Sequence, residues 1–558
     1  MTRRQACSRR EFLRAGGLIS LASLGLLSAC STPPAAPTAA PAPAATKAPE
    51  PAKPAAAATA APPAATAAPA PAATPAATAT PKKGGVLRLA HTADVNGFDP
   101  TALPTTNWPM YFALYDTLMR FDDKYKATPQ LAESWEFADG GKRLTMKLRK
   151  GVTFHSGRDF TADDVVYTLG RFQDKDLAAN MRTLALYIKQ AKADDKYIVT
   201  FTMDQPNAAI LDLFDLMFIM DRDREKDIKT KSGGTGPFTL KSWINGDRVT
   251  FQHNPNYWKQ GKPYLDGIEI PVVPDFSALS INVETAAVDM AEGVLPNDLK
   301  RLQGSANLDV LITAYGSLCD DIVMNCSKPP FNNVKVRQAI NLAIDRDRFA
   351  KNFYAGFSGP TCLPYPSNSP GYFEDQAKAC EFNLDKAKQL LKDAGLTTVE
   401  ANILTNSKGN AAGSTLAQIL QADAAKIGIN LRIEDLESAV YRTRTLGKDF
   451  QIAVHGYGRG NKDPVTMLTT AVVWLPNCDQ NIASYCNEKY TTLVNQAQTT
   501  TDVEKRKPIL REINQLLTAE CFTLPIVPRF MPYVKQKKVQ GFATNLDGMP
   551  IYDDMWLA

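Results

Sequence analysis

The chain has 558 residues, of which 44% are hydrophobic and 22% are charged, and its formal net charge is +5. This length allows two or three compact domains, and the composition excludes a wholly disordered chain. A positive net charge is compatible with nucleic-acid binding. However, residues 1–83 hold nine of the 63 basic residues and two of the 58 acidic ones, which leaves a net charge of −2 for residues 84–558. We therefore expect no nucleic-acid partner, because the body of the chain lacks the positive surface that a phosphate backbone needs.

The first 29 residues are predicted to be an export signal. Basic residues precede an uncharged run from Ala15 to Ala29. As a helix this run is only about 22 Å long, too short to span a bilayer. Residues 8–13 (Ser-Arg-Arg-Glu-Phe-Leu) resemble the twin-arginine export consensus, and a Sec signal that happens to contain Arg-Arg is the alternative. We predict a twin-arginine-type lipoprotein signal peptide over 1–29.

The signal ends in Leu27-Ser28-Ala29-Cys30, which resembles the lipobox of bacterial lipoproteins. In such proteins the cysteine is acylated and becomes the mature N-terminus, so lipidation of Cys30 would hold the protein at the membrane. Residues 31–83 contain 25 Ala, 14 Pro and 8 Thr, and prolines at this density exclude a helix. Residues 30–83 are therefore predicted to be the lipidated cysteine and a disordered tether. Glycosylation of the tether is left open.

From residue 84 onward the pattern is that of a folded α/β protein. Apolar residues at alternating positions predict strands at 86–89, 144–148 and 429–433, and apolar residues at helical spacing predict helices at 336–344, 384–394 and 414–427. Thr161 is expected to cap a helix whose first turn contains Asp163 and Asp164. Neighbouring residues on a helix point about 100° apart, so we interpret these two acids as a solvated helix start and not as an acid pair.

Signatures of catalysis and metal binding are missing from the sequence. The four histidines form neither H-E-x-x-H nor an i, i+4 pair, and no G-x-S-x-G occurs. The glycine-rich stretch Gly233–Pro237 lacks the Lys-Ser/Thr ending of a P-loop. We therefore expect no enzyme activity, no catalytic residue, no metal site and no cofactor. Carboxylate pairs that only the fold assembles remain open.

Seven cysteines follow the predicted signal and Cys30, and disulfides are permitted outside the cytoplasm. Cys478 and Cys486 flank a short polar loop and are the first predicted pair. Cys362 and Cys380 flank a proline-rich loop and are the second. The other three are Cys319, Cys326 and Cys521. One of Cys319 and Cys326 could meet Cys521, and because seven is odd at least one thiol stays unpaired.

Four groups of motifs occur in order along the body of the chain. They are Leu131–Glu136 with Leu148–Arg158 and Thr161–Tyr167, then Gly234–Phe238 with Trp243, Gly246 and Asn254–Trp258, then Pro330–Phe331 with Val336–Ile340 and Ala343–Arg346, and finally Lys386–Gly395. Together they resemble the extracytoplasmic solute-binding proteins of ABC importers, specifically the family 5 group of peptide and nickel binders. The likeness runs from Gly84 to Ala558 and so covers the whole body of the chain.

The resemblance implies a two-lobed α/β clamp of the periplasmic-binding-protein type, with an extra subdomain in the first lobe. Lobe I would be residues 84–320, lobe II 321–522, and residues 523–558 would return to lobe I. The ligand, a peptide or similar polar solute, would be enclosed by a hinge motion and delivered to an ABC permease. We expect a monomer, outside the cytoplasm and anchored by lipid. A secreted hydrolase, or a chaperone or sensor on the same scaffold, is the alternative.

The resemblance also indicates candidate ligand contacts. In the peptide-binding members, the first aspartate of Gly-Trp-x-x-Asp-x-x-Asp-Pro holds the peptide's α-amine. The matching stretch here is 456–464, in which the second aspartate is Asp463 and the first falls on Gly460. The candidate contacts are Tyr457, Arg459, Asp463, Trp474, Asn107, Trp108 and Tyr111. Lobe core or turn structure is the alternative role for each of them.

Overall fold

The computed structural model describes residues 80–102, 107–177, 179–457 and 462–558. The predicted signal peptide, Cys30, Arg459 and Gly460 lie outside these ranges, as does all but the end of the predicted tether. The described residues form a mixed α/β fold, which confirms the predicted fold class. Within these ranges we find no helix with the length and apolar character needed to cross a bilayer.

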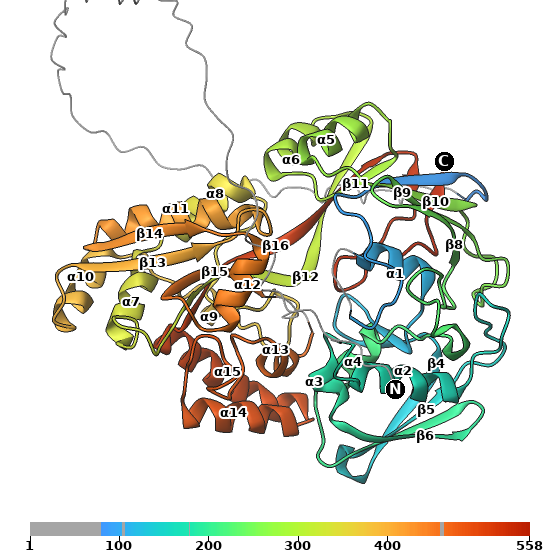
Figure 1. The fold of residues 1–558 in the computed structure, drawn as a ribbon, viewed down its shortest axis with the longest axis horizontal. Helices are drawn as coiled ribbons and strands as arrows, with labels where there is room; N and C mark the ends of the chain where they lie inside the picture. The colour runs from blue at the N-terminus through green and yellow to red at the C-terminus, as the bar shows by residue number, and fades with distance from the viewer. Residues whose placement is uncertain (1–79, 103–106, 178, 458–461) are drawn as a thin grey trace, which may run out of the picture. The chain divides into compact units, whose positions relative to one another are not determined.

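A ten-stranded mixed sheet runs through this part of the chain, in the order β14-β13-β15-β12-β16-β11-β1-β10-β9-β8 (Figure 1). Its strands are β1 (Val86–Ala90), β8 (Phe238–Ile244), β9 (Arg248–His253), β10 (Gly267–Pro271), β11 (Met290–Glu292), β12 (Leu308–Met324), β13 (Val399–Thr405), β14 (Ile429–Asp435), β15 (Ile452–Tyr457) and β16 (Thr523–Gln536). The central strands β12 and β16 pair with each other, while β12 also pairs with β15 and β16 with β11. We refer to the chain before β12, together with the residues after β16, as the first lobe, and to the chain between β12 and β16 as the second lobe.

The first lobe carries a second, four-stranded antiparallel sheet in the order β4-β5-β7-β6. Its strands are β4 (Ala132–Ala138), β5 (Arg143–Leu148), β6 (Ile188–Asp195) and β7 (Ile198–Met203). Helix α2 (Ala162–Gln173) places Val165, Leu169 and Phe172 on its buried side, at the spacing of a helix face. The other elements of this lobe are α1 (Trp108–Leu114), β2 (Met119–Phe121), β3 (Ala127–Pro129), η2 (Asp139–Gly141), α3 (Arg182–Ala185), α4 (Ile210–Leu216), η3 (Arg222–Arg224), α5 (Phe276–Glu284), α6 (Pro296–Leu302), β17 (Val539–Gln540) and β18 (Trp556–Leu557).

The second lobe is built on the parallel strands β13, β14 and β15, with helices that contribute to two apolar cores. Its helices are α7 (Val334–Ala343), α8 (Arg346–Tyr354), α9 (Glu374–Ala377), α10 (Leu384–Asp393), α11 (Ala411–Ala425), α12 (Ser438–Leu446), α13 (Pro464–Thr470), α14 (Glu488–Thr499) and α15 (Val503–Glu520). The sequence predicted α7, α10, α11 and β14, and the structure confirms them to within a few residues at each end. Asn383 caps α10, because its side chain accepts the N–H of Lys386.

The structure contains both disulfides that the sequence analysis paired. Cys362 is bonded to Cys380, and Cys478 is bonded to Cys486. The three remaining cysteines of the described chain are free thiols, and they are Cys319, Cys326 and Cys521. The suggested bond between Cys521 and one of the other two is therefore not present.

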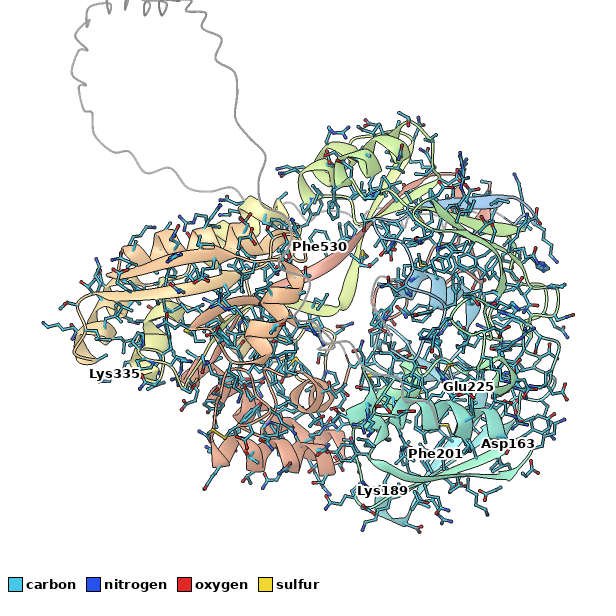
Figure 2. The ribbon with its side chains drawn as sticks, in the orientation of Figure 1. Asp163, Lys189, Phe201, Glu225, Lys335 and Phe530 are labelled. Carbon is cyan, nitrogen blue, oxygen red and sulfur yellow. A yellow bond between two sulfur atoms is a disulfide. The ribbon has the colours of Figure 1, made fainter. Side chains whose placement is uncertain are left out.

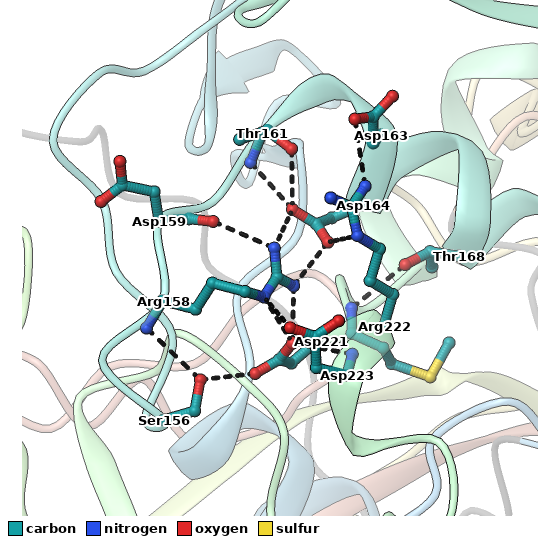
Figure 3. A network of polar contacts seen from close by, with 11 residues as sticks. Ser156, Arg158, Asp159, Thr161, Asp163, Asp164, Thr168, Asp221, Arg222 and Asp223 are labelled. Carbon is teal, nitrogen blue, oxygen red and sulfur yellow. Dashed lines mark hydrogen bonds and ion pairs between the residues drawn. The ribbon is translucent and has the colours of Figure 1, made fainter.

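The prediction of a solvated helix start at α2 is wrong for one of its two acids. Thr161 and Asp164 form the expected cap, since the Asp164 carboxylate accepts the Thr161 N–H at 2.9 Å. However, Asp164 is fully buried, and its carboxylate meets the Arg158 guanidinium at 2.6 Å. The same guanidinium pairs with buried Asp221 at 2.5 Å. Figure 3 shows Arg158 held between these two acids, whereas Asp163 lies at the edge of the network. The side chains converge through the fold, which adjacency in sequence does not reveal.

The β12–β16 pair has an irregularity where it passes from one lobe to the other. Its register shifts between the pairs Ala314–Phe530 and Cys319–Pro528, and again at Asp321. Figure 2 marks Phe530 on this stretch of β16. Such an irregularity bends a strand and interrupts its ladder locally. The two lobes are therefore joined by continuous strands that contain a bend.

Candidate functional site

The sequence-predicted loop begins at the end of β15. Tyr457, the last residue of that strand, is 8% exposed and stacks on His455 with ring centroids 4.1 Å apart. Its hydroxyl has no hydrogen-bond partner among the described residues. Burial raises the pKa of this phenol and lowers the pKa of His455 to about 4. Both side chains are therefore uncharged near neutral pH. Arg459, the next candidate along the chain, lies outside the described residues.

Asp463 is held within the second lobe. Its side chain accepts the N–H of Val465 at the start of α13, and its carboxylate pairs with Arg506 at 2.6 Å. Both side chains are at least 96% buried. Burial raises the pKa of Asp463, and the charge of Arg506 opposes this effect. These contacts give Asp463 a structural role as helix cap and ion-pair partner.

The start of α13 also contacts helix α4 of the first lobe. We refer to Lys462, Thr466, Asp212, Asp215 and Asp547 as the Lys462 cluster. The Lys462 ammonium contacts the Asp215 carboxylate and lies 3.2 Å from Asp547, and all three groups are buried. The Asp212 carboxylate accepts the Asp463 N–H at 3.0 Å and the hydroxyl of Thr466. Charged groups of one lobe are thus neutralised by groups of the other.

The electrostatics of the cluster follow from its burial. Desolvation alone would lower the pKa of Lys462, but the three aspartates around it raise the pKa above its ordinary value, so Lys462 is charged. Burial raises the pKa of Asp212 to about 7, and the negative charge of Asp463 acts in the same direction. The Tyr125 hydroxyl donates to Asp212 at 2.5 Å. This inter-lobe contact therefore contains one acid that titrates near neutral pH.

The three candidates near the start of the chain are all buried in the first lobe. The Asn107 amide donates to the Gly97 carbonyl at 2.8 Å and accepts the Asn96 N–H at 3.3 Å. The Tyr111 hydroxyl donates to the Asp99 carbonyl at 2.9 Å. Trp108 is 4% exposed and belongs to the core of the first lobe. The structure thus shows all three in lobe-core positions, with Asn107 and Tyr111 holding residues 96–99 in place.

Trp474 belongs to the core of the second lobe. It is fully buried and packs edge-on against Phe522, with ring centroids 5.7 Å apart. Its indole N–H has no hydrogen-bond partner among the described residues. The side chain lines a cavity of about 170 Å³ that Cys362, Cys380 and Cys521 also line. This cavity is distinct from the Lys462 cluster.

Two adjacent acids on β12, which the sequence analysis missed, lie beside the end of β15. Asp320 accepts the Arg529 Nε–H at 2.7 Å and the Tyr354 hydroxyl. Asp321 is fully buried, and no N–H or O–H group of the described chain donates to either of its oxygens. The only sequence signal was an Asp-Asp pair preceding the apolar run of a strand, and acids are uncommon in buried strands.

Arg529 lies in the walls of two cavities. The first, about 260 Å³, is lined from both lobes, by His91 and Glu292 of the first and Tyr354 and Asn410 of the second. The second, about 420 Å³, includes Cys319, Tyr365 and Lys378 in its wall. No group of three or more His, Cys, Asp or Glu side chains in the described ranges is arranged to hold a metal ion. The candidate functional site is therefore this junction of the lobes, a place suited to enclosing a solute.

Comparison with known proteins assigns the family. The model of bacterial extracellular solute-binding proteins, family 5 middle region, matches residues 126–473. The chain belongs to this family, whose fold is the two-lobed periplasmic-binding-protein type. The dipeptide-binding protein of Pseudomonas aeruginosa is 28% identical over 487 residues, which cover 80% of this chain and 90% of that protein. Heme-binding protein A of Haemophilus influenzae is 28% identical over 432 residues, covering 71% and 78%.

A solved structure agrees with this assignment. The ABC transporter-associated periplasmic binding protein DppA from Helicobacter pylori, in complex with the peptide STSA, is 28% identical and matches with a TM-score of 0.74. The match covers 85% of this chain and 98% of that chain. These relatives are binding proteins, so the present protein is an extracytoplasmic solute-binding protein and not an enzyme.

Proposed function

We propose that the protein is the membrane-tethered solute-binding component of an ABC importer, and that it captures a peptide or similar polar solute between its lobes. The observation that carries the proposal is the Lys462 cluster, in which charged groups of the two lobes meet at the loop that the sequence had indicated. Such contacts stabilise a closed form, and a ligand favours closure only by binding that form more tightly. The family assignment and the peptide-binding relatives support the same conclusion.

We further propose the lobe boundaries 84–320, 321–522 and 523–558, with the hinge in the β12–β16 pair. The register shifts between Ala314 and Asp321 support this placement, because they interrupt the ladder where the chain passes between lobes. Closure would then bend the two connecting strands and bring α4 onto the start of α13. An ABC permease is the proposed partner of the closed form, and the binding protein is proposed to act as a monomer.

The ligand class is tested by native mass spectrometry of the purified protein, followed by thermal denaturation with peptides, sugars and metal chelates. We expect a retained peptide-like mass or a rise in melting temperature with short peptides, since a ligand that binds only the folded state stabilises it. A shift with sugars or chelates alone would contradict the peptide assignment. Hydrolysis of an ester or glycoside without any stabilising ligand would contradict the binding function itself.

A further inference from the structure

Arg346, the first residue of α8, is a buried cation whose hydrogen-bond acceptors are all neutral. It is 5% exposed. Its guanidinium donates to the Pro525 carbonyl at 3.0 Å, to the Asn341 carbonyl at 3.2 Å and to the Asn341 amide oxygen at 2.6 Å. A guanidinium has five N–H donors, so these contacts leave part of its capacity unused. Burial lowers the pKa of Arg346 to about 10, so the group is still charged near neutral pH.

No group in contact with Arg346 carries the opposite charge. Among the described residues no Asp or Glu forms an ion pair with it, and the groups that oppose the fall in its pKa are the thiols of Cys521 and Cys319. Burial raises the pKa of Cys521 to about 12 and that of Cys319 well above its ordinary value, so both thiols are uncharged. A buried charge that nothing compensates is costly.

The nearest acids do not change this balance. Asp345, Asp347 and Glu381 line a cavity of about 530 Å³ that Arg346 also borders, but none of the three forms an ion pair with it. No Asp or Glu occurs in the internal residues outside the described ranges, which are 103–106, 178 and 458–461. The folded body of the chain therefore supplies no counter-ion for Arg346.

The cavity of about 170 Å³ in the second lobe brings Arg346 together with two other unsatisfied groups. Arg346, Trp474 and Thr523 all belong to its wall, which contains no Asp, Glu, Lys or His. The Trp474 indole N–H and the Thr523 hydroxyl have no partner among the described residues, although both side chains are at most 2% exposed. Buried polar groups are nearly always hydrogen-bonded, so such groups around one cavity indicate a bound molecule.

We infer that this cavity binds a small monovalent anion, a halide or a short carboxylate, between the Arg346 guanidinium, the Trp474 indole N–H and the Thr523 hydroxyl. The wall offers one positive charge and donors, and its volume is below the roughly 300 Å³ at which pockets for larger ligands begin. The anion links the start of α8 to the start of β16 and so stabilises the second lobe. This site is separate from the junction of the lobes, and the proposed solute capture does not depend on it.

The test follows thermal denaturation of the purified protein in sodium bromide, and separately in sodium formate, exchanged against sodium gluconate at constant ionic strength. Gluconate, a bulky anion, is the reference. We expect a saturable rise in melting temperature with bromide or formate, because a ligand that binds only the folded state stabilises it. T523V removes one donor and should weaken the apparent affinity at least about fivefold. T398V makes the same change at an exposed position and should respond as the wild type does.

Arg346 itself is not replaced, because its bonds to Asn341 and Pro525 also hold the fold together. Anomalous diffraction from crystals soaked in sodium bromide locates the ion directly, and we expect a peak beside Arg346 and Trp474. Equal melting temperatures in the three salts would overturn the inference, whatever the crystals show. If T523V responds as the wild type does, diffraction decides: a bromide peak in the cavity supports the site, and a cavity without one overturns it. Neither result affects the test of peptide capture.

Discussion

At the residue scale, the clearest lesson comes from Asp163 and Asp164, which are neighbours with opposite environments. Asp163 is exposed and pairs with Arg222 at 3.1 Å, whereas Asp164 is buried and pairs with Arg158. The helix pattern predicted their place at the start of α2 but not the burial of one of them. That burial depends on Arg158 and Asp221, which approach from other elements (Figure 3). The sequence therefore predicts the helix cap, whereas the contribution of Asp164 to stability depends on tertiary contacts.

We predict that D164N lowers the free energy of unfolding by about 2–3 kcal/mol, because Arg158 loses a charged hydrogen-bond partner in a buried network. D163N should change it by less than about 0.5 kcal/mol, as is usual for exposed positions. Urea denaturation followed by circular dichroism measures both values. Equal losses in the two variants would contradict the burial of Asp164 as the reason.

At the scale of elements, local patterns predicted those helices and strands whose signals lie within one segment. Helices α7, α10 and α11 have apolar residues at helical spacing, and α10 also has an asparagine cap and Gly395 at its end. The pairing of β12 with β16 could not be predicted, because it joins segments far apart in sequence. For the same reason the sequence did not indicate Lys462 or Asp321, because the surroundings of these two side chains form only in the folded protein.

The contact between α4 and the start of α13 yields a prediction for Lys462. K462M leaves Asp215 and Asp547 buried without a cation, so we expect a loss of about 3–5 kcal/mol in unfolding free energy. The double variant K462M/D215L should recover part of the loss, since it removes both members of one pair. K408M, at an exposed pair with Glu437, serves as control and should cost less than about 1 kcal/mol. Thermal denaturation measures all three, and a neutral K462M would contradict the proposed role of the Lys462 cluster.

The same contact predicts a dependence on pH. Asp212 titrates near 7 in the folded protein but near the usual aspartate value of about 4 when unfolded. The folded state therefore binds this proton more tightly, and its stability falls as the pH rises from about 4 to about 7. The groups that face Asp212 are Tyr125, Lys462, Asp463 and Thr466. D212N, which cannot ionise, should show a smaller loss of stability between pH 5.5 and pH 8 than the wild type, measured by urea denaturation at both pH values. An unchanged difference would contradict the shifted pKa.

At the scale of the whole molecule, composition was informative only after it was divided along the chain. The net charge of +5 comes from residues 1–83, and the folded body is slightly acidic. The motif order predicted the two-lobed fold, and the family match confirms it. The candidate ligand contacts could not be predicted in this way. Asn107, Tyr111 and Asp463 have hydrogen-bond or ion-pair partners within the protein. Residue type and position in the sequence therefore could not distinguish a ligand contact from a structural role.

The proposed membrane anchor is tested on the complete chain. C30S removes the acylated thiol and should move the protein from the membrane fraction to the soluble fraction, because no other acyl chain would hold it. Fractionation of cells expressing the wild type and the variant, followed by immunoblotting, measures this. C326S, a change at a free thiol of the folded body, is the matched control and should remain with the membrane. Unchanged membrane association of C30S would contradict the anchor.

The position of β16 has a consequence for how the protein is made. This strand spans Thr523–Gln536, close to the end of synthesis, yet it lies at the centre of the large sheet. Its side chains also enter the cores of both lobes, for example Tyr533 in the first and Ile526 in the second. Until β16 emerges from the ribosome, β11 and β12 lack the strand between them. Both apolar cores also lack the side chains that β16 contributes. The lobes therefore cannot fold one after the other during translation, as independent domains do. Any chain that terminates before β16 would leave edges of β11 and β12 unpaired, and such edges favour pairing with other chains.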